Sequence, residues 1–189
     1  FPIGALTVLT ITFLAVFVGG IGIIIAVLVV RSMRSAHRVR TAVQKIDSGR
    51  NLEAIRHLAD VIKEHPDDLV SLFNLASLQV ESNLPFEGMQ NIKKLLERNL
   101  AASGVSHVSV VLLAARAEFA LGNRKEGAKY LMMARGIDGT NIEVNNSLAA
   151  YNYEEGVFQD AYGYAWRVLK LEPDNVDGNY YSGMAAFQL

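Results

Sequence analysis

The hydrophobic pattern divides the chain into two parts. Residues 3–30 form a long apolar run of 28 positions without a charged side chain, and charged residues are spread through the rest. A bilayer-spanning helix needs roughly 18–20 such positions, whereas the apolar part of a cleavable signal peptide has about 7–15. The sequence therefore predicts one retained transmembrane helix, and we place this anchor with its basic flank at residues 1–34.

Small residues follow one face of this predicted helix. Ala15, Gly19, Gly22 and Ala26 are spaced by four, three and four positions. Small side chains let a second transmembrane helix approach closely, so the face predicts a contact with a transmembrane partner. The alternative is that glycine and alanine are simply common in membrane helices.

A basic cluster comes directly after the apolar run. It contains Arg31, Arg34 and Arg38, together with His37 and Arg40. Basic flanks normally stay on the cytoplasmic side and can contact anionic lipid headgroups. We therefore expect a single-pass membrane protein whose remaining residues lie in the cytoplasm; a periplasmic or lumenal arrangement is the alternative. Residues 23–48 contain no glycine or proline, which predicts a helix continuous with the anchor.

Pairs of small or turn-forming residues recur behind the anchor. Within each pair the offset is five, and the pairs follow one another after 34, 39 and 34 residues: Gly49 and Ala54, Asn83 and Gly88, Gly122 and Gly127, Gly156 and Ala161. A period of about 34 residues is typical of helix–turn–helix repeats that stack into a solenoid. In each unit the first helix ends at the turn residue, and the second carries the small residue where the helices cross.

The junctions between units carry helix stop and start signals. His65-Pro66-Asp67-Asp68 and Glu172-Pro173-Asp174-Asn175 each place a proline before an Asp or Asn, and Asp138-Gly139-Thr140-Asn141 has glycine instead. Proline cannot continue a helix, and a following Asp or Asn can cap the next one.

With this period and these junctions the chain resembles the tetratricopeptide repeat (TPR) family. Small residues agree with the family at Ala54, Ala76, Ala115, Ala134, Ala149, Ala161 and Gly183, while Leu100 stands where proline is usual. The resemblance implies an all-α fold, in which a right-handed TPR-type solenoid at 35–189 follows the transmembrane helix. Its repeats would be 35–68, 69–102, 108–141 and 142–175, with a partial fifth at 176–189 and an insertion at 103–107.

The cysteine count and the distribution of charge limit the kinds of site and partner that are possible. The chain has no cysteine, which excludes disulfides and thiolate metal sites. Residues 1–46 carry five basic and no acidic side chains, whereas residues 136–189 carry two basic and eight acidic ones. The acidic end would repel phosphate, so we expect no nucleic acid partner. A basic protein partner at that end is one interpretation, and a solvated acidic surface is the other.

The sequence shows no arrangement typical of catalysis. None of His37, His57, His65 and His107 has a partner at ligand spacing, so we expect no metal site and no cofactor. Ser106-His107 has no acidic residue nearby in the sequence to complete a triad. We therefore expect no enzyme activity from these residues, although an enzyme domain beyond residue 189 is an open alternative.

The family resemblance implies a binding groove lined by the first helix of each repeat. By register the binding residues would be Asn74, Ser77, Arg116, Asn146, Tyr153 and Tyr180. Phe73, Phe119 and Met184 lie in the same register, and the two phenylalanines could equally be core residues. Some family members hold a terminal carboxylate with lysines, but Val39, Phe73 and Leu112 occupy those positions, so we expect no such clamp.

Two functions follow from these features. The first is a membrane-anchored scaffold that binds a protein or peptide at the membrane face, within or assembling a larger membrane complex. The second is a permanent structural subunit of a membrane machine, whose groove has no client.

Overall fold

The structure is a computed structural model that describes residues 51–101 and 103–189. The predicted transmembrane helix, its small-residue face, the basic flank and the first helix of the first repeat lie outside these residues. Within the described ranges no helix is both long enough and apolar enough to span a bilayer.

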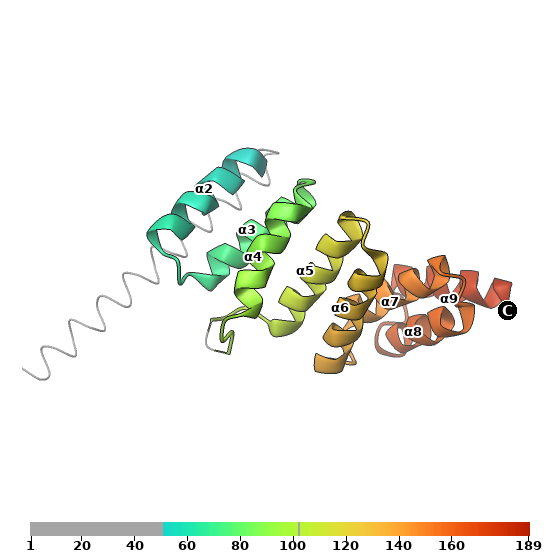
Figure 1. The fold of residues 1–189 in the computed structure, drawn as a ribbon. Helices are drawn as coiled ribbons and strands as arrows, with labels where there is room; N and C mark the ends of the chain where they lie inside the picture. The colour runs from blue at the N-terminus through green and yellow to red at the C-terminus, as the bar shows by residue number, and fades with distance from the viewer. Residues whose placement is uncertain (1–50, 102) are drawn as a thin grey trace, which may run out of the picture.

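The described residues form helices and no strand. The helices run one after another as α2 (Asn51–Glu64), α3 (Leu69–Glu81), α4 (Pro85–Leu96), α5 (His107–Ala120), α6 (Arg124–Ile137), α7 (Ile142–Glu154), α8 (Phe158–Leu171) and α9 (Val176–Gln188). Figure 1 shows them side by side in an elongated array, with each helix packed on its neighbours in sequence. Short connections favour such antiparallel neighbours. The all-α prediction is confirmed for this part of the chain.

Three helical hairpins make up most of the array: α3 with α4, α5 with α6, and α7 with α8. The turn inside each hairpin contains a residue with a left-handed backbone, namely Asn83 (φ 61°), Gly122 (φ 81°) and Gly156 (φ 75°). Glycine adopts this conformation without a steric cost, and asparagine tolerates it better than most residues. The predicted turn positions are therefore confirmed at these three hairpins.

The two helices of a hairpin cross closely at the predicted small residue. A Cβ atom added to Gly127 would lie 2.7 Å from the Phe119 ring, and one added to Gly88 would lie 2.7 Å from Val80 Cγ2. Ala161 is fully buried at the matching place of α8. In the hairpins of α4 and α6 the second helix thus packs against the first at a position that has no room for a larger side chain.

Polar caps fix the start of three of the four described first helices, α3, α7 and α9, whereas Ser106 before α5 makes no side-chain cap bond. The Ser71 backbone N–H donates to Asp68 Oδ1 (3.0 Å), and that of Val144 donates to Asn141 Oδ1 (3.0 Å). Asn175 Oδ1 accepts in the same way from the Gly178 N–H (2.9 Å). These bonds satisfy backbone donors that the first helical turn leaves unpaired, as the junction signals predict.

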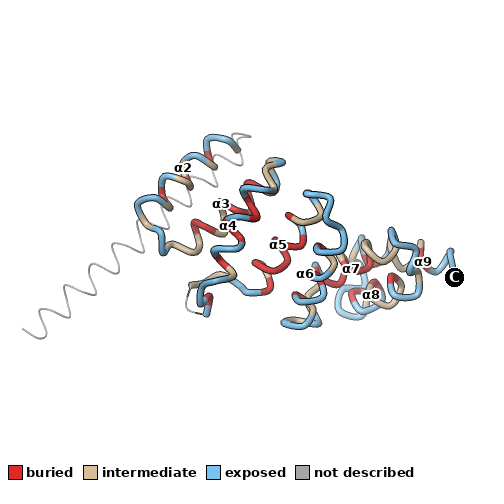
Figure 2. The backbone as a smooth tube through the Cα atoms, viewed as in Figure 1, coloured by how far each residue is buried: buried red, intermediate tan, exposed pale blue. Residues whose placement is uncertain are grey.

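The core runs along the array between the helices (Figure 2). Phe73 and Phe119 pack against core clusters, so both are packing residues rather than free groove side chains. Leu100 is also buried in the core, which explains how an apolar residue replaces the usual proline at the end of its repeat. The insertion after it is held locally, because the Ser103 hydroxyl donates to the Leu100 carbonyl (2.8 Å).

We predict that Gly127→Leu lowers the free energy of unfolding by about 1–3 kcal/mol, because the larger side chain must displace the Phe119 ring. Urea unfolding of the full chain in mild detergent, followed by circular dichroism, measures this. Gly136→Ala is the control on the same helix: its added Cβ meets nothing within 4 Å, and alanine favours a helix by about 0.5–1 kcal/mol. Equal stability of the Leu variant and the wild type would contradict the close crossing.

Candidate functional site

The candidate site is the surface formed by α3, α5, α7 and α9, which we call the first-helix surface. All six predicted binding residues lie on these helices: Asn74 and Ser77 on α3, Arg116 on α5, Asn146 and Tyr153 on α7, and Tyr180 on α9. The structure gives each of them different neighbours, so they do not form one uniform site.

On α3 the two predicted residues are bonded within their own helix. The Asn74 amide donates to the Val70 carbonyl (2.9 Å), and the Ser77 hydroxyl donates to Glu81 Oε1 (3.0 Å). Both are half-buried. A ligand would compete with these local bonds, so this end of the surface is the less prepared for binding.

An ion pair joins α5 to α7. The Arg116 guanidinium pairs with the Glu143 carboxylate, and both side chains are about half-exposed. Exposed pairs of this kind contribute only about 0–1 kcal/mol. Arg116, predicted as a binding residue by register, is therefore already paired within the chain.

Asparagines connect α7 to α9. The Asn146 amide donates to Asn175 Oδ1 (3.1 Å), the same oxygen that caps α9. Asn146, predicted as a binding residue, already has an acceptor for its amide nitrogen in Asn175, while its buried Oδ1 has no hydrogen-bond partner. Asn146 thus belongs to the junction between the last two repeats.

Two further asparagines, which the sequence analysis did not place in the site, stabilise the turns before α7 and α9. The Asn145 amide donates to the carbonyls of Gly139 (3.0 Å) and Asn141 (2.8 Å). Asn179 makes the same pair of bonds to Pro173 and Asn175 (3.0 Å each). Asn145 and Asn179 each stand four residues after a capping asparagine, and this shared spacing is the signal that could have revealed their role.

A tyrosine cluster covers the α7–α9 part of the surface. The Tyr153 ring centroid lies 6.0 Å from that of Tyr181, and Tyr181 meets Tyr180 edge-on at 5.0 Å. Tyr180 is 55% exposed and so presents much of its ring to solvent. Tyr181 was missed by the sequence analysis, because its register placed it outside the implied groove.

Two carboxylates lie near this cluster: Asp177, and Glu154, which pairs with Arg124 of α6 at 2.9 Å. The pKa of Tyr181 is raised, first by burial and then by the charges of Glu154 and Asp177. Both effects disfavour a phenolate, and the carboxylates would favour a cation at the same place.

Charge separates between the two sets of helices. Among the four first helices α3, α5, α7 and α9, Arg116 is the only Arg or Lys. The second helices α4, α6 and α8 instead carry Lys93, Lys94, Arg124, Lys125, Lys129, Arg135, Arg167 and Lys170, against Glu87, Glu126 and Asp160. Helix α2 is the exception among the second helices, with Arg56 and Lys63 against Glu53, Asp60 and Glu64. A charge count by sequence position hides this pattern, because the two kinds of helix alternate along the chain.

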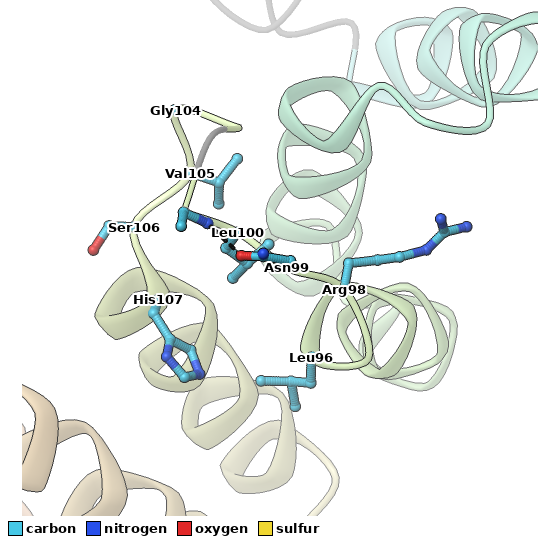
Figure 3. Close-up of a pocket in the computed structure, with 9 residues that line it drawn as sticks. Leu96, Arg98, Asn99, Leu100, Gly104, Val105, Ser106 and His107 are labelled. Carbon is cyan, nitrogen blue, oxygen red and sulfur yellow. Dashed lines mark hydrogen bonds between the residues drawn. The ribbon is translucent and has the colours of Figure 1, made fainter.

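A separate hollow lies at the insertion between the second and third repeats (Figure 3). It is lined by Leu96, Arg98, Asn99, Leu100, Ala101, Gly104, Val105, Ser106 and His107. The Ser106 hydroxyl and the His107 ring point in different directions, so they do not form a catalytic pair. In residues 51–101 and 103–189 no three His, Asp or Glu side chains gather as a metal site would require.

Comparison with known proteins identifies the fold. No family model matches the sequence, and none of the curated proteins matches it. Solved structures do match: MamA has a TM-score of 0.66 at 16% identity, and the match covers 82% of this chain and 81% of MamA. A tetratricopeptide repeat protein from Parabacteroides merdae has a TM-score of 0.67 at 11% identity, covering 82% of this chain and 59% of that one.

YrrB, a TPR protein with an unusual peptide-binding site, is similar at a TM-score of 0.59 and 14% identity, covering 80% of this chain and 76% of YrrB. At these identities the matches establish the fold alone. The described residues have the fold of TPR proteins, so the resemblance inferred from the sequence is confirmed at that level. TPR-like solenoids present extended surfaces for binding other proteins.

We predict that Asn175→Ala lowers the free energy of unfolding by about 1–2 kcal/mol, because α9 loses its cap and Asn146 loses its acceptor. Asn175→Ser is the matched control, since serine is an equally good cap but cannot reach Asn146. Chemical denaturation should therefore rank the stabilities as wild type, Ser variant and Ala variant. An Ala variant as stable as the wild type would exclude this junction as a stabilising element.

Proposed function

We propose that this chain is a membrane-anchored TPR scaffold that binds a basic segment of a protein partner on the first-helix surface at α7 and α9. The observation that carries the proposal is the tyrosine cluster Tyr153, Tyr180 and Tyr181 beside Glu154 and Asp177. Rings and carboxylates together suit a lysine or arginine side chain, which can lie over a ring and meet a carboxylate.

The surrounding surface supports a cationic partner. Helices α7 and α9 themselves carry no Lys or Arg that would repel such a segment. The nearby cations are paired, Arg124 of α6 with Glu154 and Glu155 and Arg116 of α5 with Glu143, which leaves Asp177 as the carboxylate for the partner. Tyr180 offers an exposed ring on a rigid helix, which loses little conformational entropy on binding. That YrrB has a peptide-binding site supports peptide recognition as a use of this fold.

The membrane part of the proposal rests on the sequence. The charge-free run at 3–30 would anchor the scaffold, and Arg31, Arg34 and Arg38 would hold the repeats at the cytoplasmic face against anionic lipid. The face with Gly19 and Gly22 would contact a transmembrane helix of the same complex. The scaffold would then hold its partner close to the membrane while the complex assembles.

The partner test uses the full chain purified from native membranes in mild detergent, with quantitative mass spectrometry of the proteins that copurify. We expect Asp177→Asn combined with Tyr180→Ser to lower recovery of a salt-sensitive companion about fivefold to thirtyfold, the effect of losing roughly 1–2 kcal/mol. The control is Phe86→Ser, which removes an exposed ring from the second helix α4. If both variants recover the companion equally, the α7–α9 surface does not bind it.

A second candidate is a permanent structural subunit, and the exposed apolar side chains of α9 and of Leu189 directly after it favour it. Val176, Phe187 and Leu189 are 79%, 84% and 66% exposed. A permanent neighbour covering them would stay bound through a high-salt wash in fixed stoichiometry. We expect Phe187→Ser to release such a neighbour, while Asp177→Asn leaves it bound; a companion lost in salt alone contradicts this candidate.

A further inference from the structure

A second surface, on the outside of α6 and α8, carries exposed large apolar side chains that have no role in binding the proposed partner. Its apolar members are Met132, Met133 and Ile137 from α6 with Trp166 and Leu171 from α8, each between 46% and 55% exposed. We call these five residues the α6/α8 patch. Clusters of exposed large apolar side chains with a polar rim mark interaction sites.

The two helices contact each other beside the patch, through Tyr164. The Tyr164 hydroxyl of α8 donates to Met132 Sδ of α6 at 3.7 Å. The Arg135 guanidinium of α6 lies 5.4 Å from the centre of the same tyrosine ring. Helices α6 and α8 therefore contact each other through side chains that are 32 positions apart in sequence.

Cations surround the patch. Lys170 Nζ lies 4.1 Å from the centre of the Trp166 ring, and Arg167 lies 5.2 Å from that of Tyr164. Lys125 and Lys129 line a shallow, open hollow with Met132 and Met133. The carboxylates of these helices, Glu126 and Asp160, lie in their first turns, and Glu126 pairs with Lys129.

This combination suits an anionic lipid surface better than an acidic protein segment. Tryptophan and tyrosine favour the headgroup level because one end of each ring is polar, and Lys and Arg place their stems along apolar surface while the charge reaches phosphate. A protein segment would need a shaped pocket for its side chains, whereas the hollow beside Met132 is open. A bilayer needs only an amphipathic face of this kind.

We propose that the outer surface of α6 and α8 lies on the headgroup region of an anionic bilayer, with Trp166 and the two methionines at the interface. The first-helix surface, formed by the other set of helices, then stays open to a partner. The docking rests on the proposed membrane anchor but does not depend on the proposed partner, so the docking and the partner binding can fail separately.

Trp166 is the only tryptophan in the chain, so its fluorescence reports this surface alone. The full chain is reconstituted in nanodiscs of phosphatidylcholine, or of phosphatidylcholine with phosphatidylserine, each with and without brominated acyl chains. We expect the emission to shift to shorter wavelength, and bromine to quench it, only in the phosphatidylserine discs. High salt should reverse both effects, because it screens the exposed charges.

The test variant replaces Lys125, Lys129, Arg167 and Lys170 with Gln and should lose the shift and the quenching. The control replaces Arg56, Lys63, Lys93 and Lys94 with Gln, which removes the same charge from α2 and α4, and should keep both. Circular dichroism checks that both variants fold.

Three outcomes would overturn the proposal. Emission that is the same in both kinds of disc excludes docking on anionic lipid. Equal quenching in both excludes a role for lipid charge, since an apolar contact alone needs none. A shift that appears only when a copurified acidic protein is added back identifies the patch as a protein-binding surface.

Discussion

The structure depends on the close approach of two helices at one small residue in each hairpin. Gly127 against the Phe119 ring and Gly88 against Val80 leave no space for a side chain at the crossing. Because the crossing fixes how the two helices lie, it also fixes which residues of each face outward. The core clusters, the first-helix surface and the α6/α8 patch are all consequences of this contact repeating along the chain.

The repeated packing places on different surfaces side chains of different kinds that are interspersed in the sequence. First and second helices alternate along the chain, but they contribute to different surfaces of the array. Tyrosines and carboxylates therefore gather at α7 and α9, while Lys, Arg, Met and Trp gather at α6 and α8. A solenoid can in this way carry two surfaces of opposite charge on a chain whose net charge is only −1. The two proposals, a basic partner on one surface and an anionic bilayer on the other, follow from that separation.

Several asparagines whose chemistry would suit ligand binding instead stabilise the junctions between repeats. Asn146 and Asn175 join α7 to α9, and Asn145 and Asn179 each bind two carbonyls of the preceding turn. An amide at a junction satisfies backbone groups that a helix end leaves unpaired, so it stabilises the fold before it can bind anything. Exposed rings such as Tyr180 are freer to bind a partner, because no backbone group depends on them.

The sequence by itself determined the helical repeat, its period, the turn residues, the helix caps and the small crossing positions, because these depend on backbone geometry within a few residues. It also placed all six predicted binding residues on first helices, through the family register. Only the tertiary structure decided that Phe73 and Phe119 pack in the core, that Arg116 is paired with Glu143, and that Tyr181 joins Tyr153. These contacts join helices about 30 residues apart, and which partner a side chain meets there depends on how neighbouring repeats pack, which no local pattern encodes.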